Sequence, residues 1–277
     1  MFSGGRVARI SYTGTTAMGA AIEFREVSFA LPQGRRLLER ISLTVDEGST
    51  TVVLGRSGSG KTTLLRTVNR MVDATSGTVL VGGEDVRQTD LPRLRRGIGY
   101  VIQETGLFPH MTAERDVGLV LEAEGRPKEE RLRRSHELLS AVGLDPEAFA
   151  RRYPHELSGG QRQRVGLARA LAGDPPVLLM DEPFGALDPL TRAEMQDMLR
   201  GLLRRLRKTV LLVTHDLDEA LLLGDRIVLL EAGRVVADLE PEAFLQSREP
   251  AVTEYVRAFH RGEHRTAEEH RAAEERR

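Results

Sequence analysis

The chain has 277 residues, of which 40% are hydrophobic and 29% are charged, and its formal net charge is −1. This composition is typical of a globular protein, and the length allows one large domain or two lobes. The near-zero charge gives no overall attraction to nucleic acid, and the absence of cysteine excludes disulfides, thiolate metal sites and thiol catalysis. No apolar run approaches the roughly 18 residues that a membrane-spanning helix needs. We therefore expect a protein of a reducing, cytoplasmic compartment with no nucleic-acid partner.

The two ends of the chain differ in composition from the rest. Residues 1–20 are rich in Gly, Ser and Thr and are expected to form a disordered leader, with Met18 as an alternative start codon to Met1. Residues 261–277 are almost entirely charged and are expected to form a solvated tail. The folded domain is therefore predicted to span residues 21–260.

The hydrophobic pattern of this domain predicts an α/β fold. Residues 21–29 alternate between apolar and polar, as do the residues around Ile41 to Val45, which favours half-buried antiparallel strands. Helical segments such as Thr191–Arg207 separate most of the continuous apolar runs, which favours a parallel sheet. Residues 104–172 carry helical periodicity instead and predict a helical subdomain inserted into the core. The strands predicted to be buried on both faces are Thr51–Leu54, Ile98–Ile102, Val177–Met180, Val210–Val213 and Ile227–Leu230.

A glycine-rich loop between a predicted strand and a predicted helix matches the phosphate-loop pattern G-x-x-x-x-G-K-[ST]. Its glycines let successive backbone N–H groups face phosphate oxygens. Lys61 is expected to reach the β- and γ-phosphates, and the Thr62 hydroxyl to bind Mg²⁺. The residues predicted to bind the nucleotide here are Gly55, Arg56, Ser57, Gly58, Ser59, Gly60, Lys61, Thr62 and Thr63.

Two carboxylates follow the apolar run Val177–Met180. Ligands of open α/β sheets gather at the carboxyl ends of the strands, so Asp181 and Glu182 are expected to face the nucleotide. Asp181 is predicted to hold Mg²⁺, and Glu182 to act as the general base toward the attacking water.

A second glycine-rich turn, Leu157-Ser158-Gly159-Gly160-Gln161, opens another predicted helix. Helix N-termini attract anions, so this turn offers a second binding site for phosphate. With these motifs in this order, the chain resembles the nucleotide-binding subunit of ATP-binding cassette (ABC) transporters over Ile22 to Phe259. The resemblance implies a P-loop NTPase core with a parallel sheet, an antiparallel β subdomain and an inserted helical subdomain.

The resemblance also assigns roles to residues that the spacing alone does not. Gln103 matches the glutamine loop that senses Mg²⁺ and the attacking water, and His215 matches the switch histidine that contacts the γ-phosphate. Asp188 matches an aspartate that crosses a dimer interface. The catalytic set implied is Glu182, His215 and Gln103, and the metal-binding set is Thr62, Gln103 and Asp181. The other nucleotide contacts implied are Ser158, Gly159, Gly160, Gln161 and Asp188.

The family pattern implies Mg²⁺ and ATP as ligands and a second copy of the chain as a partner. Two copies would form a head-to-tail dimer, with each ATP between the phosphate loop of one copy and Ser158 and Gly160 of the other. The resemblance further implies separate integral-membrane permease subunits, indirectly a solute-binding protein, and a peripheral position on the cytoplasmic face of the membrane.

The segments Gly99–Thr112 and Asp181–Pro189 are similar to those of importers of glycine betaine, choline and related quaternary amines. The stretch after His215 is too short for the paired regulatory domains that many members of that subgroup carry, so none are expected. An importer of another small solute such as an amino acid, a soluble non-transport cassette ATPase and a small-molecule kinase are the alternatives. One departure from the family is Leu31 at the adenine-stacking position, with Phe29 two residues away.

Overall fold

A computed structural model describes residues 20–103 and 105–259. The predicted leader, apart from Ala20, and the predicted tail lie outside these residues, as do both candidate start codons. Glu104, the first residue of the predicted helical subdomain, also lies outside them.

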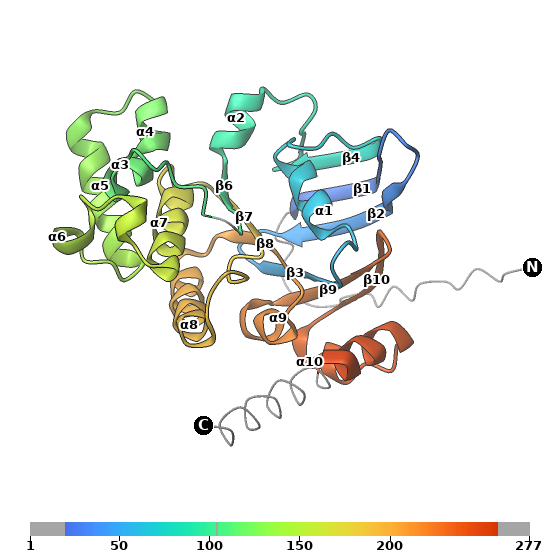
Figure 1. Cartoon of the computed structure of the whole chain (residues 1–277). Coiled ribbons are helices and arrows are strands. Elements are labelled where there is room, and N and C mark those ends of the chain that lie inside the picture. The colour runs from blue at the N-terminus through green and yellow to red at the C-terminus, as the bar shows by residue number, and fades with distance from the viewer. Residues whose placement is uncertain (1–19, 104, 260–277) are drawn as a thin grey trace, which may run out of the picture.

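A six-stranded sheet forms the centre of the molecule, in the order β10-β9-β3-β8-β7-β6 (Figure 1). Neighbouring strands are parallel except for β10, which pairs antiparallel with β9. The carboxyl ends of β3, β7 and β8 therefore meet at one edge, where Leu54 pairs with Thr214 and Asp181 pairs with Val213. The strands are β3 (Thr50–Leu54), β6 (Ile98–Val101), β7 (Val177–Asp181), β8 (Thr209–Thr214), β9 (Arg226–Glu231) and β10 (Arg234–Leu239).

A second, antiparallel sheet has the order β2-β1-β4-β5 and lies beside the first (Figure 1). β1 and β2 form a long hairpin in which Phe24 pairs with Leu43 and Val27 pairs with Ile41. These inward-facing residues are buried, which explains the alternating pattern of the sequence. The strands are β1 (Ala20–Ala30), β2 (Arg36–Asp46), β4 (Ser76–Val81) and β5 (Glu84–Asp85).

Two hydrophobic clusters cover the two faces of the six-stranded sheet. On one face, Val53, Leu211 and Val228 pack with the antiparallel sheet and with α1 (Lys61–Val68). On the other face, Val52 and Leu212 pack with α7 (Gly159–Leu171), α8 (Pro189–Leu206) and α9 (Leu217–Leu223). Burial on both faces is the reason why these strands read as continuous apolar runs.

A helical subdomain is inserted between β6 and β7 and stands to the left of the sheets in Figure 1. Leu138, Leu139 and Val142 supply its buried face, whereas His136 lies at the surface and pairs with Glu114. The remaining helices outside the subdomain are α2 (Leu91–Arg96), α10 (Pro241–Leu245) and a helix over residues 250–259. The subdomain comprises α3 (Ala113–Val117), α4 (Leu119–Ala123), α5 (Lys128–Ala141), α6 (Pro146–Phe149), the short 3-10 helix η1 (Pro154–Glu156) and α7.

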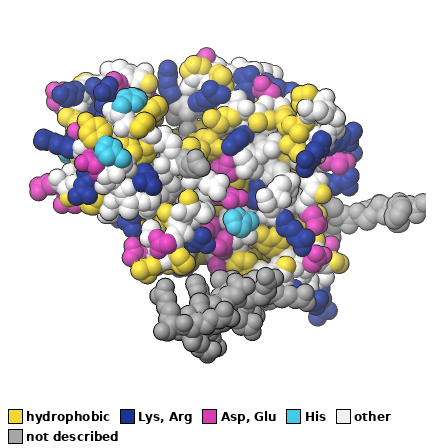
Figure 2. Space-filling view, in the orientation of Figure 1, with side chains coloured by type: hydrophobic (Ala, Val, Ile, Leu, Met, Phe, Trp, Pro, Cys, Tyr) yellow, Lys and Arg dark blue, Asp and Glu magenta, His cyan; other side chains and the backbone are white. Residues whose placement is uncertain are grey.

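The predicted α/β fold with a helical insertion is confirmed. The predicted strands agree with the structure to within one or two residues at each end, except that β2 begins at Arg36, five residues before the predicted alternation. Three strands were not predicted, namely β4, β5 and β10. In the part of the chain that the structure describes, no helix combines the length and the apolar character needed to cross a membrane. Figure 2 shows side chains of both charge signs interspersed over one face of the molecule.

Candidate functional site

The phosphate loop joins the carboxyl end of β3 to the start of α1. Gly60 precedes α1 with a φ of +107°, and a Cβ at this position would lie 2.6 Å from the carbonyl oxygen of Leu37. Only glycine fits this backbone at this distance from β2. The Lys61 ammonium donates to the carbonyl oxygens of Gly55 at 2.8 Å and Arg56 at 3.1 Å. The loop is therefore closed around the lysine with its amine at the sheet edge.

Thr62 and Asp181 form an oxygen-rich pair at the same edge. The Thr62 hydroxyl donates to a carboxylate oxygen of Asp181 at 2.7 Å. Hydroxyl and carboxylate oxygens are ligands that suit Mg²⁺, which usually keeps several waters and bridges to phosphate oxygens. Among the described residues no group of three or more Asp, Glu or His forms a metal site. The pair therefore fits a cation whose remaining ligands are water and phosphate.

Tyr100 and Arg66 hold the other oxygen of Asp181. The Tyr100 hydroxyl donates to it at 3.3 Å, and the Arg66 guanidinium lies 3.7 Å away. Burial raises the pKa of Tyr100, so its hydroxyl remains a donor at neutral pH. Neither residue belongs to the site predicted from the sequence. Tyr100 belongs to a predicted strand, but nothing in the sequence shows that its side chain faces β7.

Glu182 directly follows β7 and lies between a lysine and a histidine. Its φ of +45° is in the left-handed region, and its backbone N–H donates to the carbonyl of Val213 at 2.9 Å. One carboxylate oxygen lies 3.2 Å from Nδ1 of His215, and the other lies 3.9 Å from the Lys61 ammonium. Burial lowers the pKa of Lys61, and the carboxylates of Glu182 and Asp181 oppose this shift. The left-handed backbone of Glu182 is strained, and its carboxylate is partly exposed. A carboxylate in this position is able to accept a proton from a water molecule.

A cavity of about 380 Å³ opens beside this carboxylate. The phosphate loop, the acidic end of β7 and the end of β8 each contribute to its wall. The helix over residues 250–259 supplies the remaining wall. The lining residues are Arg56, Ser57, Glu182, His215, Tyr255, Ala258 and Phe259.

The glycine-rich turn before α7 is built as a helix start. Ser158 is the N-cap, as its position predicts, and its hydroxyl accepts from the backbone N–H of Gln161 at 3.2 Å. The side-chain oxygen of Gln161 in turn accepts a hydrogen bond from the Ser158 N–H at 3.0 Å, which completes a capping box. A Cβ at Gly160 would lie 2.4 Å from Cγ2 of Thr191 in α8, whereas one at Gly159 would meet nothing closer than 4.0 Å.

Asp188 and Gln103 flank the turn that follows Glu182. Asp188 is the N-cap of α8 and accepts from the Thr191 N–H at 3.1 Å, and the hydrogen bond from the Thr191 side chain lowers the pKa of Asp188. Gln103 lies against Gly185, where an added Cβ would be 3.1 Å from its side-chain nitrogen. Gln103 is thus beside the turn that follows Glu182.

The predicted site residues form two groups in one chain. Residues 55–63 lie with Asp181, Glu182 and His215 at the carboxyl edge of the sheet. In the described ranges, no hydrogen bond or ion pair joins the turn Leu157–Gln161 to this edge. Figure 1 places α7 and α1 on opposite sides of β7 and β8. Within one chain, the glycine-rich turn therefore does not contact the phosphate loop through any hydrogen bond or ion pair of the described residues.

Comparison with known proteins agrees with this geometry. The family model described as ABC transporter matches residues 38–185. The chain belongs to the ABC transporter family. Its curated relatives in this family include the glycine betaine/carnitine/choline transport ATP-binding protein OpuCA of Bacillus subtilis, which is 46% identical over 238 residues, covering 86% of this chain and 62% of the relative. The glycine betaine uptake system ATP-binding protein YehX of Escherichia coli is 44% identical over 238 residues, covering 86% of this chain and 76% of YehX.

Solved structures of ABC cassettes share the fold. The dimeric post-hydrolysis state of the ATP-binding cassette MJ0796, bound to ADP and Pi, superposes with a TM-score of 0.72 at 34% identity. It covers 79% of this chain and 98% of that cassette. The chain spans about three-fifths of the length of several curated ABC relatives, including OpuCA and the osmoprotectant import protein OsmV of Salmonella typhimurium.

Proposed function

We propose that this chain is the ATP-binding and ATP-hydrolysing subunit of an ABC importer. The arrangement of Glu182 between Lys61 and His215, beside the Thr62–Asp181 pair, is the observation that carries the proposal. It combines a cation to hold phosphate, oxygen ligands for a metal ion, and a carboxylate near the reacting water. The family membership and the names of the relatives support the same activity.

The residue roles in this proposal are those that the motifs and the family resemblance imply. Residues 55–63 bind the ATP phosphates, with Lys61 at the β- and γ-phosphates. Thr62 and Asp181 hold Mg²⁺, with Gln103 nearby, and the metal ion neutralises charge on the phosphates when bound. Glu182 accepts the proton of the attacking water, and His215 contacts the γ-phosphate.

A second copy of the chain completes the site. Ser158, Gly159, Gly160 and Gln161 of that copy face the γ-phosphate in a head-to-tail dimer, with Asp188 at the interface. The separation of this turn from the phosphate loop within one chain supports the arrangement, as does the dimeric form of the MJ0796 cassette. Hydrolysis removes the phosphate that joins the two copies, which couples the reaction to movement.

The transported solute in this proposal is a quaternary amine such as glycine betaine or choline. The support is the names of relatives that share 43–48% identity with the chain. The solute is delivered by a solute-binding protein and passes through separate integral-membrane permease subunits, so it does not contact this chain. The chain itself lies on the cytoplasmic face of the membrane. Import of another small solute and a non-transport cassette function are the alternatives.

Replacement of the proposed base tests the ATPase activity. Glu182→Gln keeps the size of the side chain but removes its basicity, so we expect ATP turnover to fall about 10²- to 10⁴-fold while ATP binding persists. Lys61→Ala should instead weaken ATP binding itself. Glu242→Gln, at an exposed position of α10, is the matched control and should hydrolyse ATP like the wild type. A Glu182→Gln variant with the wild-type rate would refute the assignment of the base.

Uptake into vesicles tests the solute. The chain would be reconstituted with the permease subunits that co-purify with it and with radiolabelled glycine betaine, choline or glutamine. ATP-dependent uptake of glycine betaine or choline supports the proposal, and uptake of glutamine alone supports the alternative importer. An ATPase that nucleic acid stimulates, without any membrane partner, would contradict a transport function.

A further inference from the structure

The helix over residues 250–259 lies against the candidate ATPase site. Val252 is fully buried, and Tyr255, Val256 and Phe259 pack on the hydrophobic cluster that includes α9. Tyr255 and Phe259 also line the cavity beside Glu182. The helix is therefore anchored in the core and at the same time forms a wall of the site.

Tyr255 makes a direct hydrogen bond to the backbone of His215. Its hydroxyl donates to the His215 carbonyl oxygen at 2.7 Å. Burial raises the pKa of Tyr255 to about 12, so the hydroxyl keeps its proton and remains a donor throughout the physiological range. Because the partly buried ring packs against the hydrophobic cluster, this bond holds the carbonyl at a defined position.

His215 needs such an anchor because it stands at the end of a strand. β8 ends at Thr214 and α9 begins at Leu217, so only two residues connect them. The His215 side chain is 60% exposed and meets Glu182 through Nδ1. A ring with this exposure has few packing contacts to set its direction, so its position depends on the backbone that carries it.

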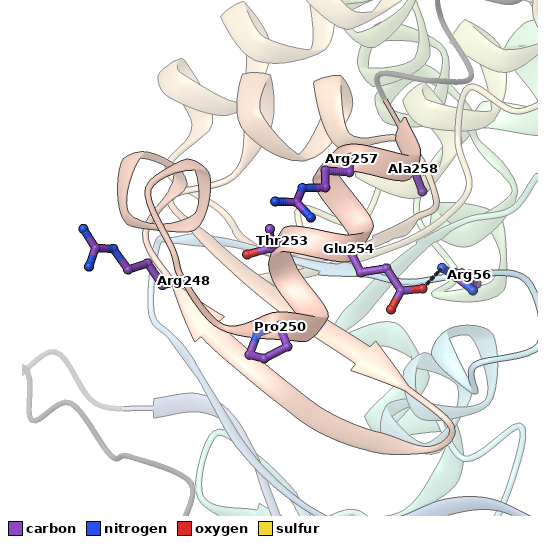
Figure 3. A pocket seen from close by; sticks show the side chains of 7 residues that line it. All are labelled: Arg56, Arg248, Pro250, Thr253, Glu254, Arg257 and Ala258. Atoms are coloured by element: carbon purple, nitrogen blue, oxygen red, sulfur yellow. Dashed lines mark hydrogen bonds and ion pairs between the residues drawn. The ribbon is translucent and has the colours of Figure 1, made fainter.

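The same helix also contacts the phosphate loop. Figure 3 shows Glu254 reaching from the helix to Arg56, and their ion pair measures 2.8 Å. Both side chains are largely exposed, so the pair contributes little to stability by itself. Through this ion pair and the Tyr255 hydrogen bond, one helix contacts both the phosphate loop and the connection between β8 and α9 that carries His215.

We propose that Tyr255 is a positioning residue, which holds the His215 backbone so that the imidazole meets the γ-phosphate of bound ATP. The inference rests on the proposed ATPase function and adds a residue that no motif contains. Tyr255 itself does not touch the reacting atoms.

Tyr255→Phe tests this role, because it removes the hydroxyl and keeps the ring in the core. We expect kcat for ATP hydrolysis to fall about five-fold, the change expected for one lost hydrogen bond. The affinity for ADP, which lacks the γ-phosphate, should not change, and the thermal midpoint should fall by no more than about 4 °C, the shift expected for one hydrogen bond in a domain of this size. Tyr153→Phe, the same change at an exposed tyrosine of the helical subdomain, is the matched control.

The outcomes separate this inference from the proposed function. An unchanged kcat in Tyr255→Phe, with an active wild type, overturns the positioning role and leaves the ATPase assignment intact. Equal losses of kcat, ADP affinity and thermal stability would also overturn it, because they indicate a general structural role. A wild-type protein without ATPase activity would refute the proposed function instead.

Discussion

Glu219 is a buried carboxyl group that we expect to make the stability of the protein depend on pH. Its side chain is 3% exposed, and one oxygen accepts from the Thr214 hydroxyl at 2.5 Å. Burial raises the pKa of Glu219 from 4.5 to about 7, and the charge of Asp216 adds to this rise. The hydrogen bond from Thr214 and the charge of Arg192 oppose it. The folded protein therefore holds this proton more tightly than the unfolded chain does.

The sign of the effect follows from this difference in proton binding. Below pH 4.5 the carboxyl is protonated in both states, and above about pH 7 it is ionised in both. Between these values the folded state binds more protons, so the free energy of unfolding falls as the pH rises. At about 1.4 kcal/mol for each pKa unit, the loss reaches up to about 3 kcal/mol by pH 8.

Glu219→Gln removes the titration and keeps an acceptor oxygen for Thr214. We would measure the free energy of unfolding in urea at pH 5 and pH 8 by circular dichroism. Relative to the wild type, the variant should gain up to about 3 kcal/mol between the two pH values. Glu242→Gln, with its side chain exposed, should follow the wild type at both. If the difference between Glu219→Gln and the wild type is the same at pH 5 and pH 8, the reasoning is refuted.

Two further predictions concern the glycine-rich turn and the nucleotide base. Gly160→Ala places a Cβ 2.4 Å from Cγ2 of Thr191 and should cost about 1–3 kcal/mol of stability, seen as a lower thermal midpoint. Thr191→Ser lacks that methyl group and should restore the midpoint; no recovery would contradict the packing argument. The resemblance places Leu31 where the family has its adenine-stacking aromatic, with Phe29 two residues away, so we expect ATP and GTP to be hydrolysed with similar kcat/KM. A strong preference for ATP would contradict this. Leu31→Tyr should lower the KM for ATP by about five-fold.

The strands around the site were predictable because their burial is complete. Every residue of β3, β7 and β8 is buried, so each reads as an uninterrupted apolar run with a clear start and end. β10 contains Arg234 and Asp238 and lies at the edge of its sheet, and β4 begins with an exposed serine followed by glycine. An edge strand with such charged residues lacks the pattern on which the prediction depends. β4 is an inner strand between β1 and β5, so in its case the polar and glycine residues at its start, and not an edge position, interrupt that pattern.

The site was predictable only where its residues are neighbours in sequence or in a motif. The phosphate loop, Asp181 and Glu182 follow directly from the strand that precedes each of them. Tyr255 reaches His215 across 40 residues of sequence, and Arg56 reaches Glu254 across 198. Such contacts are set by how helices pack on the sheet, and nothing in the local pattern encodes that packing.

The two glycines of the turn before α7 are equivalent in the sequence and different in the structure. An added Cβ at Gly160 would clash with the Thr191 methyl group of α8 in the same chain. A Cβ at Gly159 would meet only Arg162 and Leu187, each at 4.0 Å, so the same chain has room for a side chain there. An open glycine at a capped helix start leaves the backbone N–H groups accessible to an anion from outside the chain. Gly160 thus packs the turn against Thr191 of α8, whereas Gly159 leaves room at the helix start, as the proposed binding of phosphate from a second copy requires.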